Sequence, residues 1–385
     1  MKINKPSNTI LETERYLEKK YEFRMNVINH KIECKQVETE DWKELNENNI
    51  FIELHKSFIH ISMANLLSLL KSDFVQKYNP IETYFNNLNE WDLNDHIGNL
   101  SNHIITEERE RFDLQFKKML VRTIACALDD NVFNKQAFIL VHGQQNSGKT
   151  TFIRFLVPTT LKEYYAETIG TDKDSRIALC ENFIINLDEL AKLNKNDINE
   201  LKSVFSSQSE KLRRPYDRRA ERLTRRASFI GSTNSQEFLT DETGSVRWLC
   251  FNISKINWDY PNTIDIDKVW SQAFHLYRTG YKYQLTKEEI EENEHINAAH
   301  NIVTSEMELI QLYLKPGTTE EHDEFWTSTQ IMQYLVSKVE RTISLKPVLI
   351  GKALKVLEFE RVQWYNGKYQ IKGYYLSYLL TDKIN

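Results

Sequence analysis

The segment Gly143–Thr150 constrains the fold of this 385-residue chain more than any other feature. Its sequence, GQQNSGKT, matches GxxxxGK[ST] at every fixed position. It follows the apolar run Ala137–Val141 and precedes a helical pattern at Thr151–Leu156, which is the strand–loop–helix context that the motif requires. Backbone N–H groups of such a loop, and the helix N-terminus behind it, surround phosphate oxygens. The motif predicts an α/β fold around a parallel sheet.

Each residue type in this loop has an expected task. Gly143 and Gly148 let the backbone curve, Lys149 reaches the β- and γ-phosphates, and the Thr150 hydroxyl ligates Mg²⁺. We therefore expect ATP and Mg²⁺ as the bound groups. The expected nucleotide-binding residues are Gly143, Asn146, Ser147, Gly148, Lys149, Thr150 and Thr151.

Three further apolar runs alternate with helical segments up to residue 254, as in a parallel α/β sheet. These runs are Phe183–Leu187, Ser228–Gly231 and Trp248–Ile253. The first of them continues into Asp188 and Glu189. We expect Asp188 to bind Mg²⁺ and Glu189 to act as the general base that polarises the attacking water. An Asp-Glu pair at a helix start can also serve only as a cap, which remains an alternative.

Two polar residues flank the later runs. Asn234 ends the Ser228 run and is a candidate for sensing the γ-phosphate and positioning water, the alternative being an ordinary turn residue. Arg247 precedes the last run, where an arginine can reach the γ-phosphate of a neighbouring subunit or pair locally with Asp241 or Glu242. The expected catalytic set is Lys149, Glu189, Asn234 and Arg247.

Residues 211–226 hold eight basic and two acidic side chains, although the whole chain has a net charge of -5. Arginine predominates there, which suits bidentate contact with phosphate. One interpretation is a hairpin or loop that grips a nucleic-acid backbone or closes on nucleotide. The other is a solvated helix face. The residues expected to contact DNA are Arg213, Arg214, Arg218 and Arg219.

The composition on either side of the core predicts four regions. We expect a mostly helical N-terminal region at 1–120, with amphipathic stretches at Phe58–Leu67 and Phe112–Leu120. The P-loop ATPase core then occupies 121–284. Between residues 285 and 325 there are eleven acids and two bases, so 285–323 is predicted to be an acidic helix and a linker around Pro316–Thr319.

A winged-helix domain is predicted at 324–385. Helices fit Phe325–Lys338 and Leu345–Leu357, and a hairpin fits the segment after them because Asn366-Gly367 is a strong two-residue turn signal. Residues 326–375 carry eight bases and three acids, a balance that suits docking on duplex DNA.

A family resemblance rests on five motifs in order: the phosphate loop, INLDEL, LRRPYDRR, RRASFIGSTN and FLTDETGSVRW. Together they resemble the virulence-associated protein E (VapE) family of P-loop ATPases from phages and mobile elements. That family is similar to superfamily 3 helicases and has an AAA+-like core. The resemblance implies a DNA-dependent ATPase that forms a hexameric ring on single-stranded or forked DNA. It assigns family roles to Gly148, Lys149, Thr150, Asp188, Glu189, Asn234 and Arg247.

The segments Tyr21–Asn26 and Pro80–Asp92 resemble the region that precedes the ATPase in this family. Many relatives carry a primase further upstream, but about 120 residues are too few for both, so no primase activity is implied. We expect a replicative helicase-like motor of a phage or mobile element. The alternatives are a non-translocating ATP switch that regulates or loads another DNA enzyme, and an anti-phage defence ATPase.

Composition excludes several other classes. No run of about 18 apolar residues is present, and the N-terminus lacks the apolar segment of a signal peptide, so we expect a cytoplasmic protein without a membrane span. The four cysteines are scattered without a CxxC pair, which predicts reduced thiols rather than a structural zinc site.

Overall fold

The computed structural model describes two compact units. The described residues are 8–170, 172–188, 190, 201, 204–212, 220–239, 246–298, 300, 304–339, 344–365 and 370–379. The first unit comprises Met1–Leu190, Asn199–Asn234 and Leu249–Leu285. The second comprises Ala191–Ile198, Ser235–Trp248 and Thr286–Asn385.

A five-stranded sheet lies at the centre of the first unit. In spatial order its strands are β12 (Trp248–Asn252), β6 (Ala137–Val141), β11 (Ser228–Thr233), β8 (Ile184–Leu187) and β7 (Tyr165–Ala166). β11 is parallel to both β6 and β8, and β7 is parallel to β8. All residues of β6, β8 and β11 are buried, which explains their nearly continuous apolar sequences. The predicted α/β fold with a parallel sheet is confirmed.

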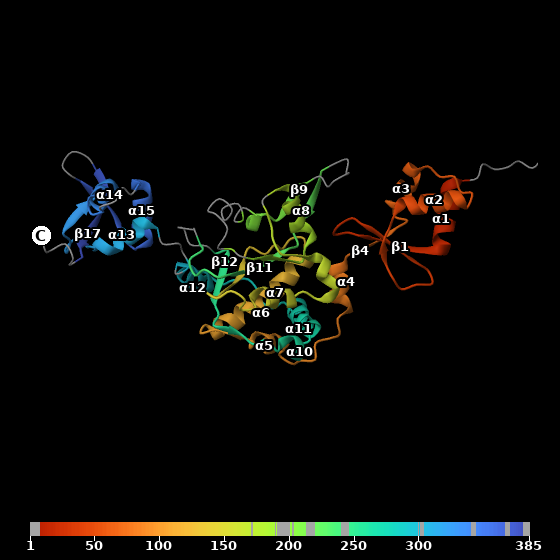
Figure 1. Ribbon diagram of the computed structural model, residues 1–385, viewed down its shortest axis with the longest axis horizontal. Coiled ribbons are helices and arrows are strands. Elements are labelled where there is room, and N and C mark those ends of the chain that lie inside the picture. The colour runs from red at the N-terminus through yellow and green to blue at the C-terminus, as the bar shows by residue number, and fades with distance from the viewer. Residues whose placement is uncertain are drawn as a thin grey trace, which may run out of the picture. The chain divides into compact units, whose positions relative to one another are not determined.

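Helices and short strands surround this sheet. Between β6 and β8 the chain forms α7 (Lys149–Phe155), the 3₁₀ helix η1 (Thr159–Tyr164), β7 and α8 (Lys173–Glu181). The other elements around it are α4 (Pro80–Asn87), α5 (His96–Ser101), β5 (Ile104–Ile105), α6 (Arg109–Leu128), β13 (Lys255–Ile256), α10 (Tyr260–Thr263) and α11 (Ile266–Arg278). α5, α6 and α11 pack together, on the far side of the unit from α8 (Figure 1).

The helix α6 crosses the expected domain boundary at residue 120 without a break. Its buried residues include Phe112, Gln115 and Phe116 and then continue without interruption from Lys118 to Ala127. Phe112 and Phe116 pack against Phe138 of β6 at ring distances of 5.6 and 5.9 Å. The core of the first unit therefore begins upstream of residue 121, because this helix contributes buried residues on both sides of the expected boundary at residue 120.

The N-terminal region contains a sheet that the expectation of a mostly helical segment missed. Its strands, in the order β3-β2-β1-β4, are β3 (Lys43–Glu44), β2 (Ile32–Gln36), β1 (Tyr21–Asn26) and β4 (Gln76–Tyr78). The helices beside it are α1 (Thr9–Lys20), α2 (Glu47–Lys56) and α3 (Met63–Leu70). The helix expected from Phe58 starts only at α3, because Phe58 has a left-handed backbone with φ 62°.

The strands β9 (Ser209–Leu212) and β10 (Glu221–Thr224) form an antiparallel hairpin on either side of the arginine-rich segment. Arg213, Arg214, Arg218 and Arg219 lie outside the described residues. Arg225, from the same basic run, is fully buried. Its guanidinium donates to four main-chain carbonyl groups, those of Asn134, Val204, Phe205 and Ala227. Part of the basic run is thus structural.

The second unit contains the C-terminal elements. They are α12 (Lys287–Ala298), α13 (Ser305–Tyr313), β14 (Leu314–Pro316), β15 (Glu324–Trp326), α14 (Ser328–Ser337), α15 (Pro347–Val356), β16 (Arg361–Tyr365) and β17 (Gln370–Tyr378). β17 pairs antiparallel with β14, β15 and β16. Residues 366–369, which include the expected Asn-Gly turn, lie outside the described part.

The linker expected around Pro316 is instead the end of strand β14. Ile310 of α13 and Leu314 of β14 are buried in the same cluster as Leu335 and Leu354. The C-terminal module therefore includes α13 and does not begin at residue 324. The helix expected from Phe325 also begins later, at Ser328, because Glu324–Trp326 pairs with β17.

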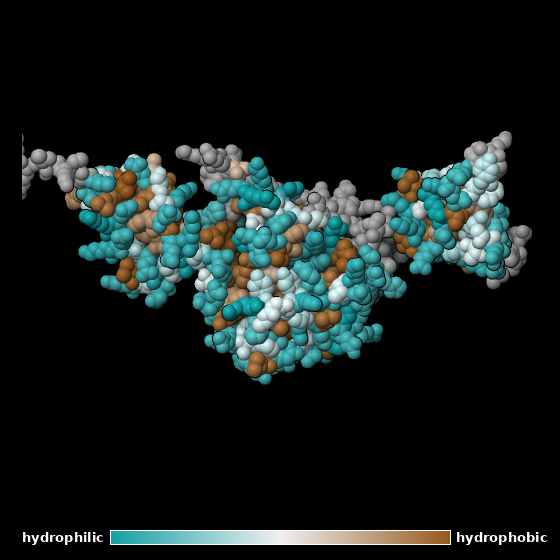
Figure 2. Space-filling model, turned by 180° about the vertical axis from the view of Figure 1, so that it is seen from behind, coloured by the Kyte–Doolittle hydropathy of each residue, from teal (hydrophilic) through white to brown (hydrophobic). Residues whose placement is uncertain are grey.

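The visible face of the molecule is mainly hydrophilic, with apolar residues in small separate patches (Figure 2). Among the described residues, no helix combines the length and the apolar character that crossing a bilayer requires.

Arg225 generates a stability prediction. Replacing it by alanine should remove one hydrogen bond from each of four main-chain carbonyl groups and leave a cavity in the core, and so lower the unfolding free energy by at least about 3 kcal/mol. Arg222→Ala is the matched control, because this exposed side chain on the same hairpin donates only to the Ser209 hydroxyl. Urea denaturation of both variants should show a large loss only for Arg225→Ala. Equal losses would contradict the structural role of Arg225.

Candidate nucleotide site

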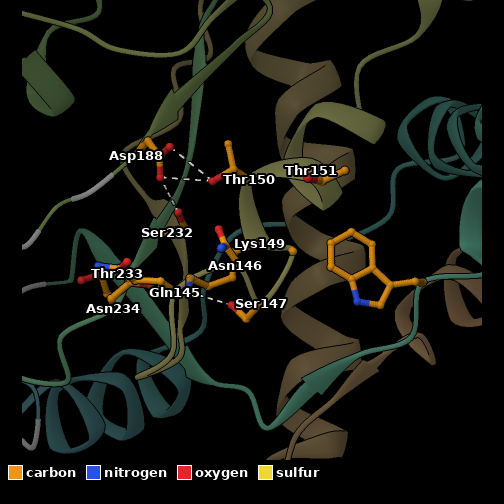
Figure 3. A pocket seen from close by; sticks show the side chains of 12 residues that line it. Gln145, Asn146, Ser147, Lys149, Thr150, Thr151, Asp188, Ser232, Thr233 and Asn234 are labelled. Atoms are coloured by element: carbon orange, nitrogen blue, oxygen red, sulfur yellow. Dashed lines mark hydrogen bonds between the residues drawn. The ribbon is translucent and has the colours of Figure 1, made fainter.

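A cavity of about 340 Å³ opens beside the phosphate loop (Figure 3). It is lined by residues from the loop, from α7 and from the ends of β8 and β11. These are Gln145, Asn146, Ser147, Gly148, Lys149, Thr150, Thr151, Asp188, Ser232, Thr233, Asn234 and Trp258. All of the predicted nucleotide-binding residues except Gly143 therefore face one space.

The strand order explains why these residues meet. The loop follows β6, Asp188 follows β8, and Asn234 follows β11, which pairs with both of the other strands. The carboxyl ends of neighbouring parallel strands lie at one edge of a sheet, where ligands bind in open α/β folds. Asn234 directly follows β11, and β11 lies beside β6, so Asn234 comes next to the phosphate loop.

The ammonium group of Lys149 lies at the centre of the loop. Its Nζ donates to Asn234 Oδ1 at 2.7 Å and to Ser147 Oγ at 2.9 Å. It also donates to the carbonyl oxygens of His142 and Gln144, each at 3.3 Å. The side chain is buried, with 6% of the residue exposed. The positive charge is therefore held by neutral acceptors at the position where the loop would surround phosphate.

Burial lowers the pKa of Lys149, and the negative charge of Asp188 opposes that shift. An anion beside a lysine favours the charged form of that lysine. The charged form of Lys149 is therefore stabilised when a polyanion enters the cavity.

The side chains of Thr150 and Asp188 lie next to each other in the lining of the cavity. The Thr150 hydroxyl lies 3.2 and 3.3 Å from the two carboxylate oxygens of Asp188. Ser232, from β11, donates to Asp188 Oδ1 at 2.7 Å and fixes the carboxylate (Figure 3). A hydroxyl and a carboxylate are hard oxygen donors, which are the ligands that Mg²⁺ prefers. This pair fits the metal site that the sequence predicted.

The loop curves through two left-handed residues, Asn146 with φ 57° and Gly148 with φ 88°. Gly148 has the positive φ for which glycine is favoured. Gly143 differs from the expectation. It does not line the cavity, and a Cβ at this position would meet nothing within 4 Å. The tight curve therefore depends on the second half of the loop.

Sequence reasoning missed Ser232 and Trp258. Ser232 precedes the predicted Asn234 by two positions on the buried strand, so its polar character in an apolar run was the available signal. Trp258 comes from the segment between β13 and α10, far from every motif. A Cβ on Gly148 would lie 2.6 Å from the Cζ2 and Cη2 atoms of Trp258, so the indole rests against the loop.

Other predicted residues are not brought into this cavity by the described part of the chain. Glu189 lies outside the described residues. Arg247 belongs to the second unit, in a partly exposed turn directly before β12. The structure therefore brings Lys149, Asn234 and Asp188 together. The roles of Glu189 as general base and of Arg247 stay predictions.

Comparison with known proteins places this site in a family. A model of the virulence-associated protein E-like domain matches residues 85–302. No curated protein matches the chain. Two apo structures of the NrS-1 C-terminal region are similar in fold, with TM-scores of 0.51 and 0.50. Each is 13% identical, covers 97% of this chain and is itself covered over 100% of its length.

The family match begins in α4 and includes the phosphate loop, Asp188, Asn234 and Arg247. It extends over more than half of the 385 residues and agrees with the resemblance inferred from the ordered motifs. The chain belongs to the virulence-associated protein E-like domain family.

Proposed function

We propose that this protein hydrolyses ATP in the cavity beside the phosphate loop. The observation that carries the proposal is the meeting of Lys149 with Asn234 and of Thr150 with Asp188 in one space. These are the parts that P-loop ATPases use: a lysine for the β- and γ-phosphates, a hydroxyl and an acid for the metal, and a polar residue near the γ-phosphate.

Thr150 and Asp188 would hold Mg²⁺, which when bound neutralises charge on the β- and γ-phosphates. Ser232 keeps the Asp188 carboxylate turned toward Thr150. Lys149 would exchange its bonds to neutral acceptors for the phosphate oxygens. Asn234 would then be released to contact the γ-phosphate or the attacking water, and Glu189, next to Asp188, would accept the proton of that water.

We further propose that hydrolysis acts on DNA, as in a helicase-like motor of a phage or mobile element. The arginine-rich segment supports this, because it connects the two paired strands β9 and β10. Arg225 at the base of the hairpin is bonded inside the core, so the hairpin has a rigid support. An arginine-rich segment joined to a hairpin that is anchored in this way suits contact with single-stranded or forked DNA.

The C-terminal module supports a winged-helix proposal. Its order is helix α13, strand β15, helices α14 and α15, and the hairpin β16–β17. A helix pair followed by a two-stranded wing is the arrangement expected from sequence. Residues 326–375, which contain this part of the module, carry eight basic and three acidic side chains, a balance that suits a DNA duplex. The hexameric ring proposed from the family resemblance would bring several such modules together.

The nucleotide site gives the first test of this function. Lys149→Ala should abolish ATP binding, because the phosphates lose their buried cation. Glu189→Gln should bind ATP but not turn it over, because an amide does not accept the proton of water. Equilibrium binding and phosphate release measure the two effects. Lys162→Ala, an exposed lysine outside the cavity, is the control. ATP hydrolysis by Lys149→Ala at the normal rate would exclude the proposed site.

The arginine-rich segment gives a second test. Replacing Arg213, Arg214, Arg218 and Arg219 by alanine should weaken binding of single-stranded DNA and flatten its salt dependence by about 0.7 per lost phosphate contact. A control of equal charge change replaces four exposed lysines of the N-terminal region, Lys19, Lys56, Lys71 and Lys77. Affinity is measured by fluorescence anisotropy across a salt series. An unchanged slope would identify the segment as a solvated surface.

The same variant separates a motor from a switch. Stimulation of ATP hydrolysis by single-stranded DNA is expected for a motor and should be lost with these arginines. A protein that binds DNA without stimulation, and displaces no strand from a forked substrate, would favour the non-translocating alternative.

Arg247 gives a third test. It directly precedes β12, the strand at one end of the sheet order, and we propose that it reaches the γ-phosphate of the adjacent subunit. Such an arginine is worth about 10³–10⁵ in rate in other NTPases. Arg247→Ala should therefore bind ATP almost normally and hydrolyse it poorly. Mixing it with Lys149→Ala should restore activity, because some interfaces of a mixed head-to-tail ring are intact. Mixed rings without restored activity would refute action between subunits.

A further inference from the structure

Trp258 is held by a rigid segment next to the phosphate loop. Ile256, two residues before it, is buried and pairs with Ile104 in the β13–β5 ladder. The N–H group of Asn257 donates to the carbonyl oxygen of His103 at 2.8 Å. The two residues before Trp258 are thus anchored to the core.

The residues after Trp258 are anchored as firmly. Tyr260 is fully buried, and its ring lies 5.4 Å from that of Phe152 and 4.9 Å from that of Phe155, both on α7. The carboxylate of Asp259 lies 3.1 Å from Nδ1 of His103. The helix that begins at the phosphate loop and the segment that carries Trp258 therefore form one packed body.

Trp258 itself is not buried, although its neighbours are. It is 54% exposed, lines the cavity and touches Gly148 with one edge of the indole. The flat aromatic side chain is therefore partly open to solvent and stands on a fixed backbone. It leaves an apolar face available beside a strongly polar space.

The cavity has two chemically different parts. Lys149, Asp188 and Asn234 provide charged and amide groups, whereas Trp258 is the aromatic residue among the described residues that line the cavity. Figure 3 shows Asp188 and Asn234 on one side of the loop and Thr151 on the other. A nucleoside triphosphate has the matching two parts, a polyanion and a flat base.

We propose that Trp258 stacks on the base of the bound nucleotide. The inference rests on the proposed function, namely that the loop holds the phosphates. Stacking needs only a π-face, which every base offers, so it discriminates by surface area rather than by hydrogen bonds. The site accepts purine nucleotides, ATP and GTP alike, more readily than pyrimidine nucleotides.

Binding measurements on the full chain test this role. Trp258→Ala should weaken ATP and ADP binding about 5- to 100-fold, as expected for loss of one base–aromatic stack. Binding of inorganic tripolyphosphate, which has no base, should be unchanged. Trp258→Phe should recover most of the nucleotide affinity, because a smaller ring still stacks. Phe58→Ala, which removes an 87% exposed aromatic ring from the N-terminal region, is the control and should change none of these affinities.

The outcomes separate this inference from the proposed function. If Trp258→Ala binds tripolyphosphate and ATP with equally reduced affinity, the indole supports the loop. That result would overturn base stacking. Unchanged ATP affinity in Trp258→Ala, beside a Lys149→Ala variant that binds no ATP, would also overturn it and leave the nucleotide site standing. Normal ATP binding by Lys149→Ala would instead overturn the proposed function.

Discussion

The pairing of β11 with both β6 and β8 is the constraint on which the candidate site depends. It aligns the ends of three parallel strands, so Lys149 after β6 meets Asn234 after β11 across 85 positions of sequence. Asp188 reaches the same edge from β8 and is tied to β11 through Ser232. All residues of the three strands are buried, so both faces of the sheet are covered by the core and the strand ends that carry the site are held in place.

The packing of α7 stabilises the phosphate loop from its other end. Phe152 and Phe155 pack on the buried Tyr260, while Trp258, two residues earlier, contacts Gly148 from outside. The loop is thus held by the polar contacts of Lys149 and by the aromatic packing of the helix α7 that follows it. A loop ordered before its ligand arrives loses less entropy on binding than a loop that must fold around it.

Arginines in this protein have two different physical roles that a charge count does not separate. Arg225 is buried, its pKa is lowered by desolvation, and neutral carbonyl oxygens satisfy its donors. Arg24 is partly buried between the rings of Trp42 and Tyr78, each 4.1 Å away, and pairs with Glu33. Arg222, by contrast, is exposed on the β9–β10 hairpin. Among the described residues, the basic run at 211–226 therefore combines a buried structural arginine, Arg225, with an exposed one, Arg222.

The sequence alone determined the features that depend on local pattern. The strand Ala137–Val141, the loop, the start of α7 and the position of Asp188 at a strand end were predictable, because a motif and an apolar run fix them within a few residues. Only the tertiary structure decided the strand order, the N-terminal sheet, the continuity of α6 through residue 120, and the burial of Arg225. It also decided that Ser232 and Trp258 enter the site. These features depend on contacts between distant segments, whose free energy comes from packing and desolvation and leaves no periodic signal in the chain.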